Sequence, residues 1–134
     1  MALEHQDSVQ GSETRDGTVN LGPVYFVPLQ NGLRSIRCNG VEAVRSLEFL
    51  VRDSSWATAP LRAIPHASST RGDFHAFGFD FSALDGAIEG KVSFEVGTGG
   101  LTARLDGCAL RDVELNRIGF VLLSPLVGLS LIHI

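Results

Sequence analysis

The residues that could take part in chemistry are few and scattered along this chain of 134 residues. Catalysis needs a nucleophile or a base together with a group that orients it. His66 and His75 lie in a proline-rich stretch and beside a predicted strand, and no third ligand stands at a metal-binding spacing from them. Both are therefore interpreted as surface histidines. The sequence also lacks a serine-hydrolase elbow, a zinc-protease helix motif and a dinucleotide-binding glycine turn, so it predicts no catalytic set, no metal site and no cofactor.

The acidic residues do not form a pair suited to sugar chemistry. Asp80, Asp85, Glu89 and Glu95 fall at outward strand positions or in turns, where solvated carboxylates are the rule. The glycine-rich residues 97–100 are followed by neither a helix nor a Lys-Ser/Thr pair, so they indicate a hairpin turn and not a phosphate loop.

One short segment differs from the rest because it joins a charged pair to the only tryptophan, Trp56. Arg52 and Asp53 stand at the end of an apolar run. One interpretation is a salt bridge at a strand end, with Trp56 closing one end of the fold. The other is a contact surface for another domain, or a platform on which a sugar ring stacks. Both readings remain open at the level of sequence.

The elements that would position these residues are strands, because the apolar positions repeat with a period of two. The clearest example is residues 88–96, where Ile88, Val92, Phe94 and Val96 share one face. Asn39-Gly40 predicts a tight hairpin, and residues 41–52 fit either a helix or a strand, of which the strand is favoured. Residues 57–72 are expected to be a loop, and the apolar residues 118–123 a strand buried on both faces. The expected core is Phe77, Phe79, Phe81, Val92, Phe94, Leu101, Leu105, Ile118 and Phe120.

The predicted fold class is therefore all-β, an antiparallel β-sandwich of about seven or eight short strands. Residues 1–20 have few large apolar groups and are expected to be a flexible, disordered amino-terminal leader. Residues 21–125 would form the sandwich domain. Residues 126–134 would be the start of a missing following domain or a non-native tail, with a genuine last strand as the alternative.

Charge and hydropathy exclude several classes of protein. The chain has 11 basic and 15 acidic residues, a formal net charge of −4, so it has no concentrated basic face for nucleic acid. No apolar run is long enough for a membrane helix, and the amino terminus is not a secretory signal. Cys38 and Cys108 have no CxxC partner and are expected to be reduced, small apolar side chains. A cytoplasmic protein is the simplest expectation.

Two segments resemble a known family. Residues 51–60 (VRDSSWATAP) and 115–125 (LNRIGFVLLSP) are similar to V-R-D-x-x-W-x-T-x-P and N-R-I-G-F-x-x-L-H-P segments in the amino-terminal region of the D-apionate lactonase family. An L-R-x-I-R sequence before Asn39 also fits, so the resemblance covers about residues 21–125. Ser124 stands where the family segment has His.

The resemblance implies a hydrolase that opens D-apionolactone to D-apionate, with an amino-terminal β-domain followed by a TIM barrel and a further β-domain. Active sites of such barrels lie in their βα loops, so no catalytic residue is transferred to this chain. The implied partners are the TIM-barrel domain, which this chain lacks, and a carbohydrate or sugar lactone. The residues expected to contact a neighbouring domain or a sugar are Arg52, Asp53, Trp56, Asn116 and Arg117.

Overall fold

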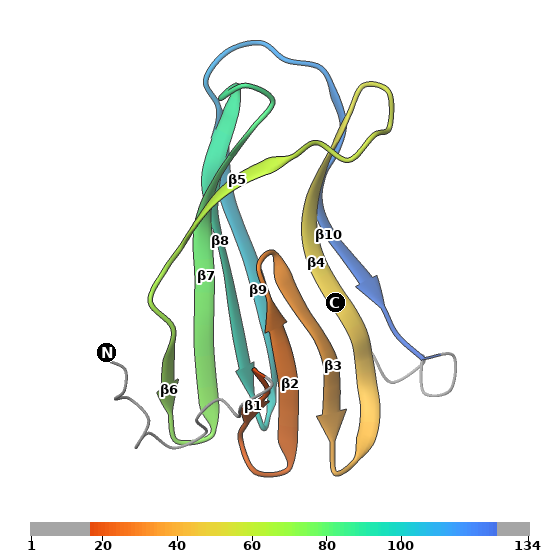
Figure 1. Ribbon diagram of the computed structural model, residues 1–134, viewed down its shortest axis with the longest axis vertical. Coiled ribbons are helices and arrows are strands. Elements are labelled where there is room, and N and C mark those ends of the chain that lie inside the picture. The colour runs from red at the N-terminus through yellow and green to blue at the C-terminus, as the bar shows by residue number, and fades with distance from the viewer. Residues whose placement is uncertain (1–16, 126–134) are drawn as a thin grey trace.

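The computed structural model describes residues 17–125, which form two antiparallel β-sheets packed face to face (Figure 1). One sheet has the order β1-β2-β3-β4-β10, and the other has the order β5-β7-β8-β9 with β6 also paired to β7. No helix long and apolar enough to cross a membrane occurs among these residues. The predicted all-β sandwich is confirmed. The strands are β1 (Val19–Asn20), β2 (Val24–Leu29), β3 (Gly32–Cys38), β4 (Val41–Asp53), β5 (Leu61–Pro65), β6 (Ser69–Arg71), β7 (Phe74–Ala83), β8 (Ile88–Gly97), β9 (Gly100–Ala109) and β10 (Leu115–Leu123).

Two tight turns set the register of the longest strands. Asn39 and Gly40 join β3 to β4 with φ angles of 53° and 81°, as a type I′ hairpin requires. The strand prediction for residues 41–52 is thereby confirmed, since β4 runs for 13 residues. The predicted glycine-rich hairpin also occurs, because β8 and β9 are joined through Thr98 and Gly99 alone.

The core lies between the sheets and follows the period-two pattern. Phe79 and Phe81 of β7 and Val92 and Phe94 of β8 are buried, as expected. On the opposite sheet Phe26 and Phe49 are fully buried, and their rings contact Phe77 and Phe81 respectively. Burial of this kind contributes about 25 cal/mol per Å² of apolar surface, so these inward positions are the main source of stability.

Five residues of the expected core are only half-buried. Phe77 packs against the core but keeps some exposure, and so do Leu101 and Leu105 of β9. Ile118 and Phe120 are half-buried because β10 is an edge strand, with a neighbour on one side only. The expectation that residues 118–123 are buried on both faces is therefore wrong for this chain.

The predicted loop over residues 57–72 contains two short strands. β5 and β6 both pair with β7, one after the other along the same edge. Their sequences carry no alternating pattern, but the long free edge of β7 provides hydrogen-bonding partners. Pro65 is tolerated because it ends β5 at the sheet edge.

The amino-terminal boundary also differs from the prediction. Val19 and Asn20 form β1, and the Val19 side chain is fully buried. A leader that extends to residue 20 is therefore too long. The rest of the predicted leader, up to residue 16, and the predicted tail 126–134 lie outside the described residues.

His75 is buried, which contradicts its interpretation as a surface histidine. Its ring packs against Phe26 and Phe77, and Nδ1 lies 2.6 Å from the Thr70 hydroxyl oxygen. Burial lowers the pKa of His75 below its usual value of 6.5, because the charged ring would lose its hydration. His75 therefore belongs to the core.

The two cysteines, Cys38 and Cys108, are free, as expected. Both are exposed at the ends of strands and do not act as buried apolar side chains.

We predict that Phe94→Ala is among the most destabilising substitutions in this chain. Phe94 is fully buried between Phe77 and Phe120, with ring centroids 5.1 and 5.8 Å away. Its truncation should lower the free energy of unfolding by about 3–5 kcal/mol. Glu95→Ala, on the exposed face of the same strand, should change it by less than about 0.5 kcal/mol. Urea denaturation measures both values, and equal midpoints would show that the faces of β8 are wrongly assigned.

We also predict that protonation of His75 destabilises the fold. In the unfolded chain His75 takes up a proton below about pH 6.5, whereas its lowered pKa in the fold delays that uptake. The unfolded state then binds more protons, so the free energy of unfolding should fall as the pH drops below about 6.5. His75→Gln should flatten this dependence, and the exposed His66→Gln is the matched control. An unchanged pH profile in the His75 variant would contradict the prediction.

Candidate functional site

The segment that contains the only tryptophan is a tight loop at the end of β4. The backbone N–H of Trp56 donates to the carbonyl of Asp53 (3.0 Å), and the N–H of Asp53 donates to the carbonyl of Ala57 (2.9 Å). The chain then turns back alongside β4, where Thr58 pairs with Arg52. We call residues 53–57 the Trp56 loop. Figure 1 shows it as the loop between β4 and β5, at the end of the sandwich where β10 begins.

Trp56 adopts a backbone conformation that disfavours an L-residue. Its φ is 66°, in the left-handed region, where a three-residue hairpin loop normally places glycine. The side chain is 58% exposed, so the interpretation of Trp56 as a plug for the sandwich end is wrong. Strain of this kind persists only when the surrounding structure enforces it.

Three polar side chains enforce the loop conformation by bonding its backbone. One carboxylate oxygen of Asp53 accepts hydrogen bonds from the N–H groups of Ser55 (2.8 Å) and Ala57 (3.0 Å). Arg52 donates to the Trp56 carbonyl (3.3 Å), and Asn116 of β10 donates to the Ser54 carbonyl (3.0 Å). The expected salt bridge between Arg52 and Asp53 is replaced by these bonds.

The structure therefore brings together four of the five residues predicted for this site, and places the fifth nearby. Arg117 stands opposite Arg52 in the β4–β10 register but is exposed, and it gives the loop no hydrogen bond within residues 17–125. Thr58 was not predicted, yet its hydroxyl accepts a hydrogen bond from Arg52 (3.1 Å). Its place in the V-R-D-x-x-W-x-T segment is the signal that could have indicated it.

Further apolar side chains are exposed at the same end of the sandwich. Leu110 and Val113 belong to the connection between β9 and β10 and are 58% and 36% exposed. Arg111 ties this connection to the β7–β8 turn by donating to the carbonyls of Leu84 (3.4 Å) and Asp85 (3.0 Å). The end of the sandwich thus combines fixed loops with exposed apolar groups.

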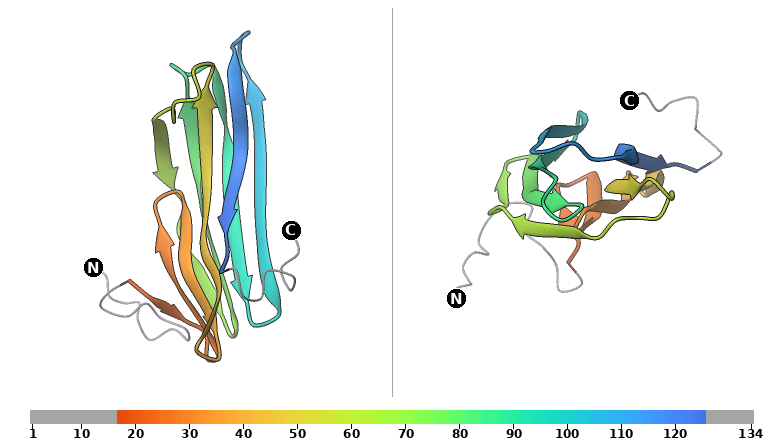
Figure 2. Two further views of the ribbon diagram at one scale, coloured as in Figure 1. Left: turned by 90° about the vertical axis from the view of Figure 1, so that its right-hand side faces the viewer. Right: turned by 90° about the horizontal axis from the view of Figure 1, so that it is seen from above.

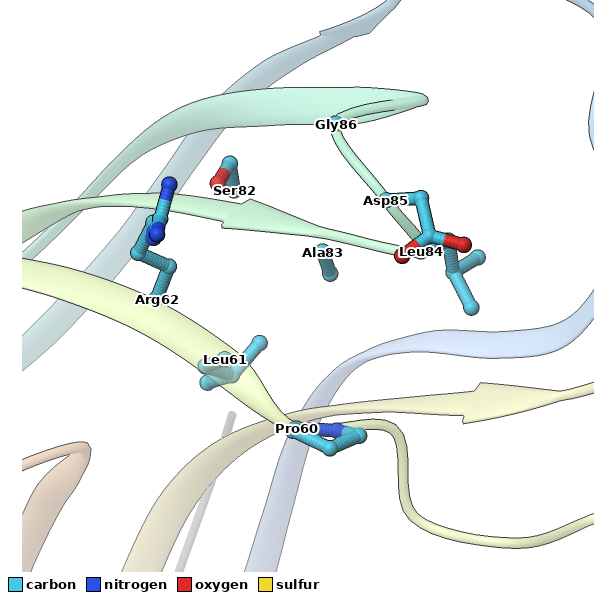
Figure 3. Close-up of a pocket in the computed structure, with 8 residues that line it drawn as sticks. All are labelled: Pro60, Leu61, Arg62, Ser82, Ala83, Leu84, Asp85 and Gly86. Atoms are coloured by element: carbon cyan, nitrogen blue, oxygen red, sulfur yellow. The ribbon is translucent and has the colours of Figure 1, made fainter.

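An open pocket of about 560 Å³ lies at this end, between β5 and the β7–β8 turn (Figure 3). Its charged groups are Arg62 and Asp85, and Ser82 lies beside Arg62 in the figure. The lining includes no aromatic ring and no histidine that could activate Ser82. Its residues are Pro60, Leu61, Arg62, Ser82, Ala83, Leu84, Asp85 and Gly86.

The remaining titratable groups do not assemble a reactive centre. The two histidines stay apart: His66 Nε2 lies 2.8 Å from an Asp80 carboxylate oxygen at an exposed position, and His75 lies in the core. Among residues 17–125, no group of three or more His, Cys, Asp or Glu side chains is placed to hold a metal ion.

We predict that Asp53→Ala loosens the Trp56 loop. The substitution leaves two backbone N–H groups without their acceptor, so the free energy of unfolding should fall by about 1–2 kcal/mol. Because Trp56 is the only tryptophan, its fluorescence anisotropy reports the loop directly and should decrease. Asp53→Asn retains an acceptor oxygen and should lose less stability, and Asp112→Ala removes an exposed carboxylate elsewhere. Anisotropy equal in all three variants would contradict the assigned role of Asp53.

The comparisons with known proteins give one match. The family model described as D-apionate lactonase, N-terminal domain, matches residues 5–131. No curated protein and no solved structure matches the chain. The match includes both segments that meet at the Trp56 loop. Since it covers nearly the whole sequence, the chain belongs to the D-apionate lactonase family, in which it corresponds to the N-terminal domain.

Proposed function

We propose that this chain is the non-catalytic N-terminal β-sandwich of a D-apionate lactonase-like hydrolase in the breakdown of the sugar apiose. In this proposal the chain is part of a longer parent protein, in which a catalytic TIM-barrel domain follows it. The description of the matched family as an N-terminal domain supports the view that the chain belongs to a longer protein. The assignment of the chain as a non-catalytic domain rests on how the described residues use their polar groups.

One observation carries the proposal. The residues that distinguish the two family-like segments, Arg52, Asp53 and Asn116, all direct their side chains at the backbone of the Trp56 loop. A catalytic group must instead reach a substrate atom, as a base, a nucleophile or an oxyanion donor. The shared residues of this domain thus shape a contact surface, and the chemistry is assigned to the following domain.

Lactone opening would need groups that residues 17–125 do not bring together. Water must be activated by a base, and the tetrahedral oxyanion must be stabilised by positioned donors. The His66–Asp80 pair is exposed, and neither residue lines the pocket beside Arg62. The pocket beside Arg62 is lined by Ser82 and by the carboxylate of Asp85, but no hydrogen bond joins these two side chains among residues 17–125.

The Trp56 ring is assigned to an interdomain contact. Tryptophan and arginine are enriched among residues that dominate the energy of protein interfaces. The two charged side chains nearest to the ring in sequence, Arg52 and Asp53, are engaged in hydrogen bonds of the loop and Thr58, and this supports a structural role for them over the selection of sugar hydroxyls.

A carbohydrate-binding module is the second candidate. The observation that favours it is the exposed face of a rigidly held indole, since aromatic rings commonly stack on sugars. In that case Trp56 would contact a sugar or sugar lactone directly, and the 134-residue chain would bind it without the following domain.

We predict that the 134-residue chain does not hydrolyse D-apionolactone and that the chain extended through the following domain does. The expected difference is complete loss of turnover, because the proposal assigns the base and the oxyanion donors to the following domain. Product formation measures it. Turnover by the short chain would overturn the assignment of this domain as non-catalytic.

A fluorescence titration separates the two candidates. Adding apiose or D-apionolactone to the 134-residue chain should leave the emission of Trp56 unchanged if the ring contacts a protein domain. A saturable change that Trp56→Ala abolishes, and that Leu110→Ala leaves intact, would favour the carbohydrate-binding module instead.

A further inference from the structure

The outer surface of the sandwich is apolar along β10 and the neighbouring part of β4. Phe120 and Leu122 point into the core, so Val121 and Leu123 point outward, and Leu123 is 53% exposed. Leu50 of β4 faces outward opposite Gly119, which has no side chain to cover it. Ser46 and Glu48 border these residues on β4. We call Leu50, Gly119, Val121 and Leu123 the β10 strip.

The outer face of the other sheet is charged. Lys91 of β8 stands between Asp80 and Asp106 of the two flanking strands. Glu89 and Glu95 point outward on the same strand and are exposed. A sheet face of this kind is stable in water, whereas exposed apolar residues gathered on one face mark interaction sites. The β10 strip, in which Leu123 is exposed and Leu50, Gly119 and Val121 are half-buried, has no charge of its own and contrasts with that face.

The edges of the two sheets lead to the same conclusion. Exposed edges invite pairing with other chains, and proteins protect them by short strands, prolines or charges. β1 has two residues, β5 ends in Pro65, and β9 directs Thr102, Arg104 and Asp106 outward. β10 has nine residues, and Arg117 is its only charge. A β-bulge and Arg117 protect the start of β10. Among the sheet edges that the structure describes, residues 118–123 of β10 form the long stretch with neither a charge nor a proline.

The inner side of this edge is also incompletely covered. β9 and β10 are the edge strands on the same side of the sandwich (Figure 2). Their inward apolar residues pack against the core without reaching full burial, unlike those of β4 and β8. The members of this half-buried row are Leu101, Ala103, Leu105, Ile118, Phe120 and Leu122.

We propose that the β10 strip and the free edge of β10 are the surface on which the following domain of the parent protein packs. β10 ends at Leu123, within the strip, so a domain that follows in the parent protein is tethered close to it at high effective concentration. The fitting partner surface is aliphatic and offers an extended segment to the backbone of β10. This inference rests on the proposed function, which supplies the following domain.

Hydrogen exchange tests the inference in the 134-residue chain and in the chain extended through the following domain. Amides of residues 115–123 should exchange at least about tenfold more slowly in the extended chain. Amides of β3, which has a strand on each side, should exchange equally in both. Equal exchange over residues 115–123 in an extended chain that hydrolyses D-apionolactone would overturn the inference and leave the proposed function intact.

A pair of variants identifies the surface. Leu123→Lys in the extended chain should abolish the added protection of residues 115–123. Val41→Lys is the matched control, because Val41 is 69% exposed and lies on β4 outside its pairing with β10. Both sites are exposed in the isolated domain, so neither variant should alter its own stability. Protection that survives Leu123→Lys would contradict the assignment of the strip.

The competing possibility is that a second copy of this chain, and not the following domain, covers the edge of β10. A second copy could pair with β10 edge to edge, and the 134-residue chain would then form a stable dimer whose β10 amides are as protected as those of the extended chain. Light scattering coupled to size exclusion measures this, and such a dimer would overturn the choice of the following domain. Protected β10 amides in an extended chain without lactonase activity would support the surface and refute the substrate of the proposed function.

Discussion

A series of contacting phenylalanine rings extends from one sheet to the other and holds the two layers of the sandwich together. Phe26 of β2 stacks on Phe77, which stacks on Phe94, with centroids 6.0 and 5.1 Å apart. Phe94 contacts Phe120 of β10, and Phe120 contacts Phe49 of β4. Each such pair contributes about 0.5–1.5 kcal/mol beyond the area that it buries. Because a shift of one residue would turn every ring outward, the rings also fix the register of their strands.

The geometry of the Trp56 loop depends on this register. The Phe49–Phe120 contact lies in the regular part of the β4–β10 pairing, and a β-bulge between Leu115 and Arg117 then places Leu115 opposite Asp53. Asn116 lies at this bulge, and its side chain donates to the Ser54 carbonyl, 62 positions earlier in the sequence. The left-handed backbone of Trp56 is therefore maintained by bonds whose donors are placed by the core. A substitution that changes the aromatic contacts would therefore alter the conformation of the loop, although the substituted residue lies outside the loop.

The sequence was sufficient to predict those elements that are determined locally. Residues 88–96 alternate so regularly that both the strand and its buried face follow, and Asn39-Gly40 determines its own turn type. β5 was not predictable in this way, because it pairs through the backbone with a free edge of β7 and has no pattern of its own.

For the candidate site, the sequence nominates residues but does not give their geometry. Arg52, Asp53 and Trp56 stand out by their residue types, and Asn116 stands out because it lies in a family-like segment. None of these signals predicts where a side chain points. The positive φ of Trp56 is invisible in the sequence because the position is not glycine. The burial of His75 was missed for a related reason: its phenylalanine neighbours come partly from another sheet.

The two exposed features of the domain lie at opposite ends of one strand. Asn116, which supports the Trp56 loop, is near the start of β10, and Leu123 is at its end. At about 3.3 Å per residue these points are roughly 23 Å apart. An interface of standard size buries about 800 Å² on each partner, which is enough to cover a strip of this length. A domain that packs along β10 from its tether at Leu123 would therefore also reach the Trp56 loop, so a single interface accounts for both the apolar strand edge and the strained tryptophan.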